Sequence, residues 1–367
     1  MVLSAIMLFV MLAFLAFTVD TGYLASSKAE IRRSADSAAI AGCWELYDGL
    51  VEGKTFSQSE ADVAAEAGRF AGFNRIANTS PGLSNEINSR SVEVGYLSSI
   101  RSSSISTDSS LPFHAVRVSV KKTAQLNGEI PFFFGRIFGD SGRAIDASAT
   151  AVMARNISGF TTPGNCHDTL NVLPFAIDLQ TWNSLNSNTA TDKFNYNPSN
   201  GTVTAGGDGI REVNLYPQGT GSPGNRGTVD IGGANNSTAD IARQIVHGIS
   251  QQDIQELGKD LKFNSEGFIT LNGDTGISAG VKDELASIIG EPRVIPVFST
   301  VSGNGNNARY TIVKWVGVRI LNVKLTGSMA SKAVIIQPAP IIARNFVISN
   351  SETSTSDYVY SPVLLAQ

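Results

Sequence analysis

The pattern of apolar and polar positions opens on a run without a single charge, from Val2 to Val19. A run of this length is at the short limit of a helix that spans a bilayer, and nothing comparable follows it. We therefore predict a single membrane anchor over residues 1–19. Two alternatives stay open: a cleaved signal peptide, which normally has a basic residue before its apolar run, and a helix buried in a core. Because no basic leader precedes the run, we also expect that the N-terminus was processed or that the start is misplaced.

The apolar run continues without a strong turn signal into a helical pattern that carries a stripe of small residues. The members of this stripe, which recur at helical spacing, are Ala35, Ala38, Ala39 and Gly42. Asp36 lies next to them. Since small side chains let another helix or a sheet approach closely, the stripe predicts a packing surface. It serves either the helix's own domain or a contact between subunits.

A second helix and three strands are predicted before the first domain ends. Ser57 and Glu60 have the spacing of a capping box and open the helix. Alternation of apolar and polar positions predicts strands over residues 91–97, 113–121 and 144–154. The phenylalanine-rich segment 129–140 lies between the last two strands. It predicts a short buried helix or a hairpin.

A break rich in glycine, proline and threonine at residues 159–164 is the predicted domain boundary. Residues 183–237 beyond it have few apolar runs and predict polar loops with short strands. Helices are expected at 237–248, 250–258 and 281–289. Strands then dominate, at 294–301, 310–325 and 333–337. The last residues, 351–367, are expected to form a tail or an edge strand.

Composition narrows the class of protein. A formal net charge of −4 offers no basic surface for nucleic acid. Charged residues make up only 16% and glycines number 35, a mixture that favours β-structure with long connections. Cys43 and Cys166 could form one disulfide if the chain is exported. Alternatively, Cys43 is a lone buried cysteine beside Trp44.

No motif carries catalytic or ligand chemistry in a suitable context. A glycine pattern typical of dinucleotide-binding loops is formed by Gly219, Gly221 and Gly224. Pro223 interrupts it, however, and a strand-like segment follows where a helix should begin. A D-x-S-x-T metal motif is formed by Asp146, Ser148 and Thr150. These residues alternate along a predicted strand, whereas the metal motif needs a loop.

The histidines add no candidate metal site, because His114, His167 and His247 lack metal-ligand spacing. Cys166 beside His167 is a weak candidate nucleophile, and a bridged or inert cysteine is the favoured interpretation. We therefore expect no catalytic residue, no cofactor and no metal, and an extracytoplasmic hydrolase is the least favoured class of function.

Two motifs follow the apolar run. The first is a D-x-G-Y-L step at Asp20, Gly22 and Leu24, and the second is R-x-A-D-x-A-A-x-A-G from Arg33 to Gly42. In these motifs the chain resembles the TadE/TadG-like proteins of Flp (tight adherence) pilus systems, and the resemblance covers about the first 160 residues. It implies an inner-membrane-anchored, pilin-like or pilus-assembly protein. The residues that we assign to helix packing are Asp20, Gly22, Ala35, Asp36, Ala38, Ala39 and Gly42.

The charges beside the anchor and the resemblance imply opposite orientations. Lys28, Arg32 and Arg33 follow the apolar run, and the positive-inside rule alone would place them in the cytoplasm. The resemblance implies that the bulk of the chain lies outside the cytoplasm, in the periplasm or at the bacterial cell surface. Composition agrees with the second orientation, which we adopt.

Together these patterns predict an α+β protein: an N-terminal transmembrane helix that continues into a pilin-like helix packed on an antiparallel sheet, followed by a second β-rich region with short helices. The expected domains are the anchor 1–19, a pilin-like domain 20–158, a second extracytoplasmic domain 165–350 and a tail 351–367. Expected partners are membrane lipid, through Val2 to Val19, and other pilus or assembly subunits, with no nucleic acid. The expected function is structural. The alternative is an anchored binding or adhesion module outside any filament, whose polar loops contact a surface ligand.

Overall fold

The computed structural model describes residues 2–84, 90–100, 102, 104–108, 112–185, 190–216, 226–233, 237–274, 277–303, 307–349 and 354–366. The chain forms two compact units. Unit 1 contains Met1–Met153 and Val363–Gln367, and unit 2 contains Ala154–Pro362. Unit 2 is therefore an insertion in the chain of unit 1. The elements below confirm the α+β class, with a long apolar helix followed by a β-rich region.

The first element, α1 (Val2–Val51), is one unbroken helix of 50 residues whose two halves have different surroundings. Its first half has a window with a mean hydropathy of 2.7, none of it buried, and is long and apolar enough to cross a membrane. Exposed side chains there include Leu3, Met7, Phe9, Met11, Phe14 and Phe17. From Ile31 onward one face of α1 is buried in unit 1.

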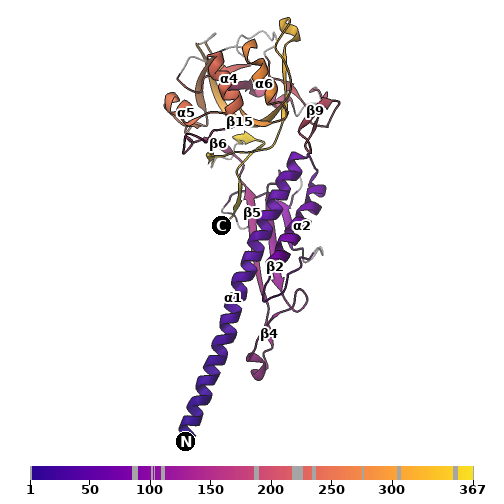
Figure 1. The fold of residues 1–367 in the computed structure, drawn as a ribbon, viewed down its shortest axis with the longest axis vertical. Helices are drawn as coiled ribbons and strands as arrows, with labels where there is room; N and C mark the ends of the chain where they lie inside the picture. Colours follow the sequence, from indigo (N-terminus) through magenta and orange to yellow (C-terminus); the bar gives the residue numbers. More distant parts are fainter. Residues whose placement is uncertain are drawn as a thin grey trace. The chain divides into compact units, whose positions relative to one another are not determined.

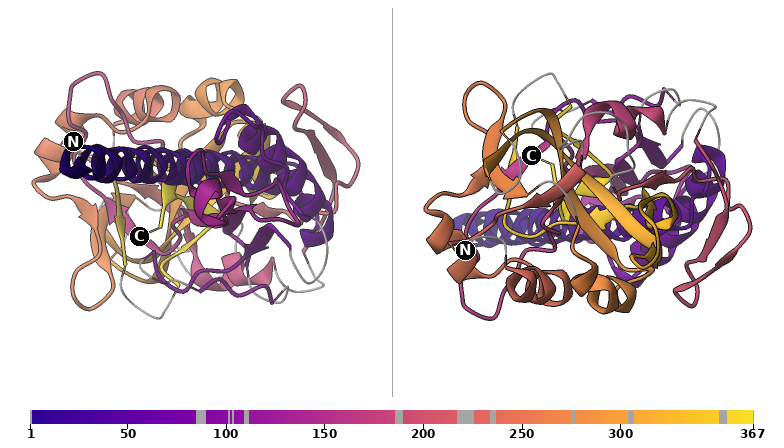
Figure 2. Two further views of the ribbon diagram at one scale, coloured as in Figure 1. Left: turned by 90° about the horizontal axis from the view of Figure 1, so that it is seen from below. Right: turned by 90° about the horizontal axis from the view of Figure 1, so that it is seen from above.

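The sheet of unit 1 has four antiparallel strands in the order β1-β2-β5-β21. They are β1 (Val92–Gly95), β2 (Ala115–Lys122), β5 (Ile145–Met153) and β21 (Val363–Leu365). Both α1 and α2 (Phe56–Phe73) pack on this sheet and on each other (Figures 1 and 2). Because the helices cover one face, β2 buries Val116, Val118 and Val120 and leaves the residues between them partly exposed. The alternation in the sequence predicted this face.

One expectation for unit 1 is wrong in detail, and an open alternative is decided. The helix α2 begins earlier than the Ser57–Glu60 pair suggested, because Thr55 is its N-cap. The Gln58 side chain accepts a hydrogen bond from the Thr55 backbone at 2.9 Å, so the capping box uses this pair instead. Of the two alternatives for the segment 129–140, the hairpin is confirmed: its two short strands are joined by a loop with one short 3-10 helix, and Phe133, Phe134 and Phe138 of that loop are exposed.

Unit 2 is built on an eight-stranded sheet in which β14 pairs with both β7 and β15. The pairing therefore closes a circuit through β15, β13, β11, β7 and β14. The strands of this sheet are β7 (Phe175–Asp178), β10 (Val213–Asn214), β11 (Arg226–Val229), β13 (Ile269–Asp274), β14 (Pro292–Ser302), β15 (Ala308–Lys324), β16 (Ala333–Pro338) and β19 (Ser356–Asp357). A closed circuit leaves fewer free strand edges than an open sheet.

The strands of this circuit send alternate side chains into two separate cores. On β14, for example, Val294 and Phe298 join one cluster, whereas Ile295 and Val297 join the other. Strands buried on both faces read as continuous apolar runs, which is why β14 and β15 showed little alternation in the sequence. Each core is completed by short helices and loops of unit 2.

Two helices of unit 2 begin where the sequence predicted them. Ser237 caps α4 (Thr238–His247) and Ser250 caps α5 (Gln251–Leu257). The third is shorter than expected. The remaining helices of this unit are α3 (Leu179–Ser184), η2 (Ala279–Val281), α6 (Lys282–Ser287) and η4 (Met329–Ser331). Its smaller sheets contain β6 (Ile157–Phe160), β8 (Phe194–Asn197), β9 (Thr202–Ala205), β12 (Leu261–Lys262), β17 (Ile341–Ile342), β18 (Phe346–Ile348) and β20 (Val359–Tyr360).

Candidate functional site at the anchor helix

The stripe of small residues lies inside unit 1. Ala35, Ala38 and Ala39 have no exposed surface, and Gly42 is buried beside them. They face α2 and the sheet, so the packing partner of this stripe is the chain's own domain. None of the four presents side-chain surface on which a second subunit could pack.

Gly42 marks a point where α1 lies close to two neighbouring elements at once. A Cβ atom at this position would lie 3.2 Å from Cγ1 of Val116 on β2 and 3.2 Å from Cγ1 of Val63 on α2. Both distances are tighter than ordinary van der Waals contact. Glycine at this position therefore lets one point of α1 touch the sheet and the second helix together.

Asp20 is the first buried residue of α1 and binds a loop at that end. Its carboxylate accepts hydrogen bonds from the backbone N–H groups of Phe133 (2.8 Å), Phe134 (3.2 Å) and Gly135 (2.8 Å). These groups form the N-terminal turn of η1 (Gly135–Phe138), which lies between β3 (Ile130–Pro131) and β4 (Gly142–Arg143). Asp20 is only 7% exposed, and a buried carboxylate needs such donors.

The loop held by Asp20 is the main feature of this site that the sequence did not reveal. The partners of Asp20 are backbone groups more than a hundred residues away, since Phe133 N and Asp20 Oδ1 are separated by 113 positions. One signal was available: an acidic residue at the end of an uncharged run must be solvated or paired. Tyr23 adds an edge-on ring contact to Phe133, with centroids 5.1 Å apart.

The other two residues assigned to helix packing lie elsewhere. Gly22 is exposed, and a Cβ atom built there would meet nothing within 4 Å. Asp36 is half-buried and lines a surface depression together with Arg32 and Asp146. A close packing contact is therefore not seen at Gly22, and the assignment of Asp36 to helix packing stays a prediction.

The two cysteines differ in environment. Cys43 is completely buried in unit 1, and Cys166 is exposed in unit 2. Burial raises the pKa of the Cys43 thiol well above its usual range, and a hydrogen bond with the Met153 backbone lowers it by less. A buried neutral thiol is unreactive. The burial of Cys43 favours its interpretation as a packing residue, while the Cys43–Cys166 pairing stays a prediction.

The metal-type and glycine-rich motifs of the sequence gain no support as ligand sites. Asp146, Ser148 and Thr150 lie on β5, as the strand interpretation required. Gly219, Gly221 and Gly224 fall outside the described residues. Within the described part of the chain, no group of three or more His, Cys, Asp or Glu side chains is placed to hold a metal ion.

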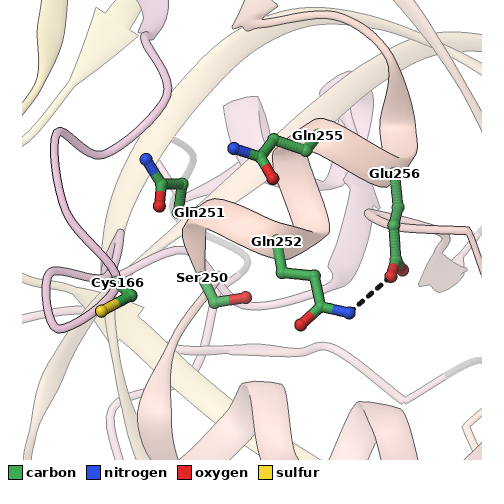
Figure 3. Close-up of a pocket in the computed structure, with 6 residues that line it drawn as sticks. All are labelled: Cys166, Ser250, Gln251, Gln252, Gln255 and Glu256. Atoms are coloured by element: carbon green, nitrogen blue, oxygen red, sulfur yellow. Dashed lines mark hydrogen bonds between the residues drawn. The ribbon is translucent and has the colours of Figure 1, made fainter.

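The depression beside Cys166 has a volume of about 630 Å³ and is walled by the polar face of α5 (Figure 3). Its lining residues are Cys166, Ser250, Gln251, Gln252, Gln255 and Glu256. The Ser250 hydroxyl donates to the Asp253 carboxylate at 2.7 Å and caps α5. Gln252 donates to Glu256 at 2.7 Å. Since these hydroxyl and amide groups serve α5 itself, we assign no catalytic role to the depression.

Comparison with protein families gives two adjoining matches. A family model described as "Putative Flp pilus-assembly TadE/G-like" matches residues 1–45, and one described as "Putative Tad-like Flp pilus-assembly" matches residues 41–151. Over residues 1–151 the chain is therefore similar to the Tad-type Flp pilus-assembly families. Comparison with curated proteins and with solved structures gives no significant match.

The Tad-type family region nearly coincides with the first segment of unit 1, which ends at Met153. It contains Asp20, the loop that Asp20 holds and the stripe of small residues. The region of unit 2 lies outside both matches. The candidate site is therefore a feature of the Tad-type part of the chain.

Overpacking the stripe should destabilise unit 1. We expect Ala38→Leu or Ala39→Leu to lower the free energy of unfolding by about 1–3 kcal/mol, because the added methyl groups have no free space. Ala25→Leu, at an exposed position on the same helix, is the matched control and should have little effect. Chemical denaturation of the full chain in detergent measures both. Equal stability of all three variants would mean that the stripe is not closely packed.

The cysteines should differ in reactivity in the native, exported protein. Without reductant, we expect Cys166 to be alkylated rapidly and Cys43 only after denaturation, because Cys43 is buried and its thiol stays neutral. Mass mapping of the non-reduced peptides measures this directly. A peptide pair joined through Cys43 and Cys166 would instead establish the disulfide.

Proposed function

We propose that the chain is a membrane-anchored structural protein of a Flp/Tad-type surface pilus, either a pilin-like subunit or an assembly factor. Its bulk lies outside the cytoplasm, and α1 anchors it in the inner membrane. This role needs neither a cofactor nor a catalytic residue. The similarity of residues 1–151 to Flp pilus-assembly families supports the pilus system as its context.

The observation that carries this proposal is the division of α1 into two halves. The half before Asp20 is apolar and exposed, whereas the half after Ile31 is the central element of unit 1. An apolar helix surface of this kind needs apolar surroundings. A bilayer supplies them before assembly, and the core of a filament built from such helices supplies them afterwards. One helix can thus serve both states without refolding.

Cell fractionation distinguishes a filament subunit from an anchored accessory protein. Filaments sheared from the cell surface are examined by electron microscopy and probed for this chain, and the membrane fraction is probed in parallel. Recovery in filaments supports a subunit, and retention in the membrane with loss of filaments on gene deletion supports an assembly factor. Membrane retention with normal filaments after deletion would contradict the proposal and favour the binding or adhesion module.

The topology makes a separate prediction. Protease added to intact spheroplasts should digest the region after residue 45, because the proposal places it outside the inner membrane. A cytoplasmic protein of the same cells is the control for intact membranes. If the region is shielded until the spheroplasts are lysed, the orientation is the reverse, and Lys28, Arg32 and Arg33 follow the positive-inside rule after all.

A further inference from the structure

The turn between β3 and β4 presents large apolar side chains on its surface. Phe133 is 59% exposed, Phe134 40%, Ile137 77% and Phe138 73%. They lie within six consecutive residues, with the exposed Arg136 among them. We call residues 132–138 the foot. Soluble domains bury such a cluster or use it to bind an apolar partner.

The foot is attached to α1 at one level. Asp20 binds three successive backbone N–H groups of the foot, and Tyr23 packs its ring against Phe133. Asp20 directly follows Val19, the last residue of the uncharged run. Figure 1 shows the turn before β4 beside the N-terminal half of α1, and the view from below in Figure 2 shows it against the same helix. The apolar surface of the foot therefore continues the apolar surface of the anchor.

The geometry points to a second membrane contact: the foot inserts into the bilayer interface next to α1, with Phe133, Phe134, Ile137 and Phe138 in contact with lipid. Its occupant is lipid because the foot is fixed where the uncharged run of α1 ends, the level at which a bilayer that covers this run has its headgroups. Phenylalanine side chains are typical of segments that lie in this interface with their apolar face against the acyl chains. Arg136 can extend its guanidinium toward the phosphates while its stem stays among apolar groups.

This inference rests on the anchor of the proposed function and adds a consequence for the helix. A lone apolar helix can slide and rotate within a bilayer. A helix that is joined through Asp20 to an inserted foot has a fixed depth in the bilayer and a fixed rotation about its own axis. The foot would thus set how far unit 1 stands above the membrane, whichever side of the membrane that is.

Site-specific fluorophores on the full chain in lipid vesicles test the foot. Single cysteines are placed at Ile137 in the foot, at Leu12 in the anchor and at Ser57, in a Cys166→Ser background in which the buried Cys43 is retained. Ser57 is exposed at the start of α2, beside the far end of α1. At this end of α1, Gly49 faces Ser59 of α2. Gly49 lies 29 residues beyond Asp20, which is roughly 44 Å along a helix. Each label is exposed to aqueous iodide and to lipid that carries a nitroxide near its headgroup.

We expect the Ile137 label to be quenched by the lipid nitroxide and protected from iodide several-fold better than the Ser57 label. Asp20→Ala should reduce lipid quenching at Ile137, because the foot loses its three hydrogen bonds to α1, and should leave the Leu12 label unchanged. Ile137→Ser with Phe138→Ser, labelled at Phe133→Cys, should reduce lipid quenching of that label while Asp20 stays intact.

Three outcomes would overturn the inference, and each has its own pattern. Iodide quenching at Ile137 equal to that at Ser57 would place the foot in water. A label at Ile137 that is shielded from both quenchers, increasingly so at high protein density, would mean that a second copy of the chain covers the foot. Absence of lipid quenching at Leu12 would remove the anchor itself, and with it both the foot and the proposed membrane attachment.

Discussion

One unbroken helix has to satisfy two different surroundings, and the structure of unit 1 follows from that constraint. Before Asp20 the side chains of α1 are large and apolar, which suits lipid or other helices. After Ile31 its inward face consists mostly of small residues, which lets α2 and the sheet come close. Because the helix contains no break, whatever holds its first half also fixes the direction of the second.

Two contacts that hold α1 in unit 1 depend on different interactions. At Gly42 the contact is steric, since a single Cβ atom would press on both Val116 and Val63. At Asp20 it is electrostatic, since a carboxylate with little access to water is satisfied by three N–H groups of one turn. A larger side chain at the steric contact would require its neighbours to shift. The electrostatic contact needs a carboxylate of the right length, which Asp20 supplies.

Local patterns were predictable from the sequence, and long-range ones were not. Ser237 and Ser250 were identified as caps because capping depends on a few neighbouring residues. The start of α2 was misassigned because Thr55 with Gln58 and Ser57 with Glu60 fit the same pattern. For the phenylalanine-rich segment 129–140 the sequence indicated either a short buried helix or a hairpin and could not decide between them, because composition reveals an apolar segment but not what covers it. That depends on Asp20, far away in the sequence.

The arrangement of the chain explains how a Tad-type unit can carry an unmatched region. The last strand, β21, returns to pair with β5, with Val363 opposite Met153. Within unit 2, Ala154 and Ser361 are joined by two hydrogen bonds of 2.8 and 2.9 Å. The points where the chain enters and leaves unit 2 are thus adjacent. The insertion of unit 2 therefore connects two neighbouring strands of unit 1, β5 and β21. Such a connection lets unit 2 differ in size and surface while the anchor helix and its sheet keep their packing.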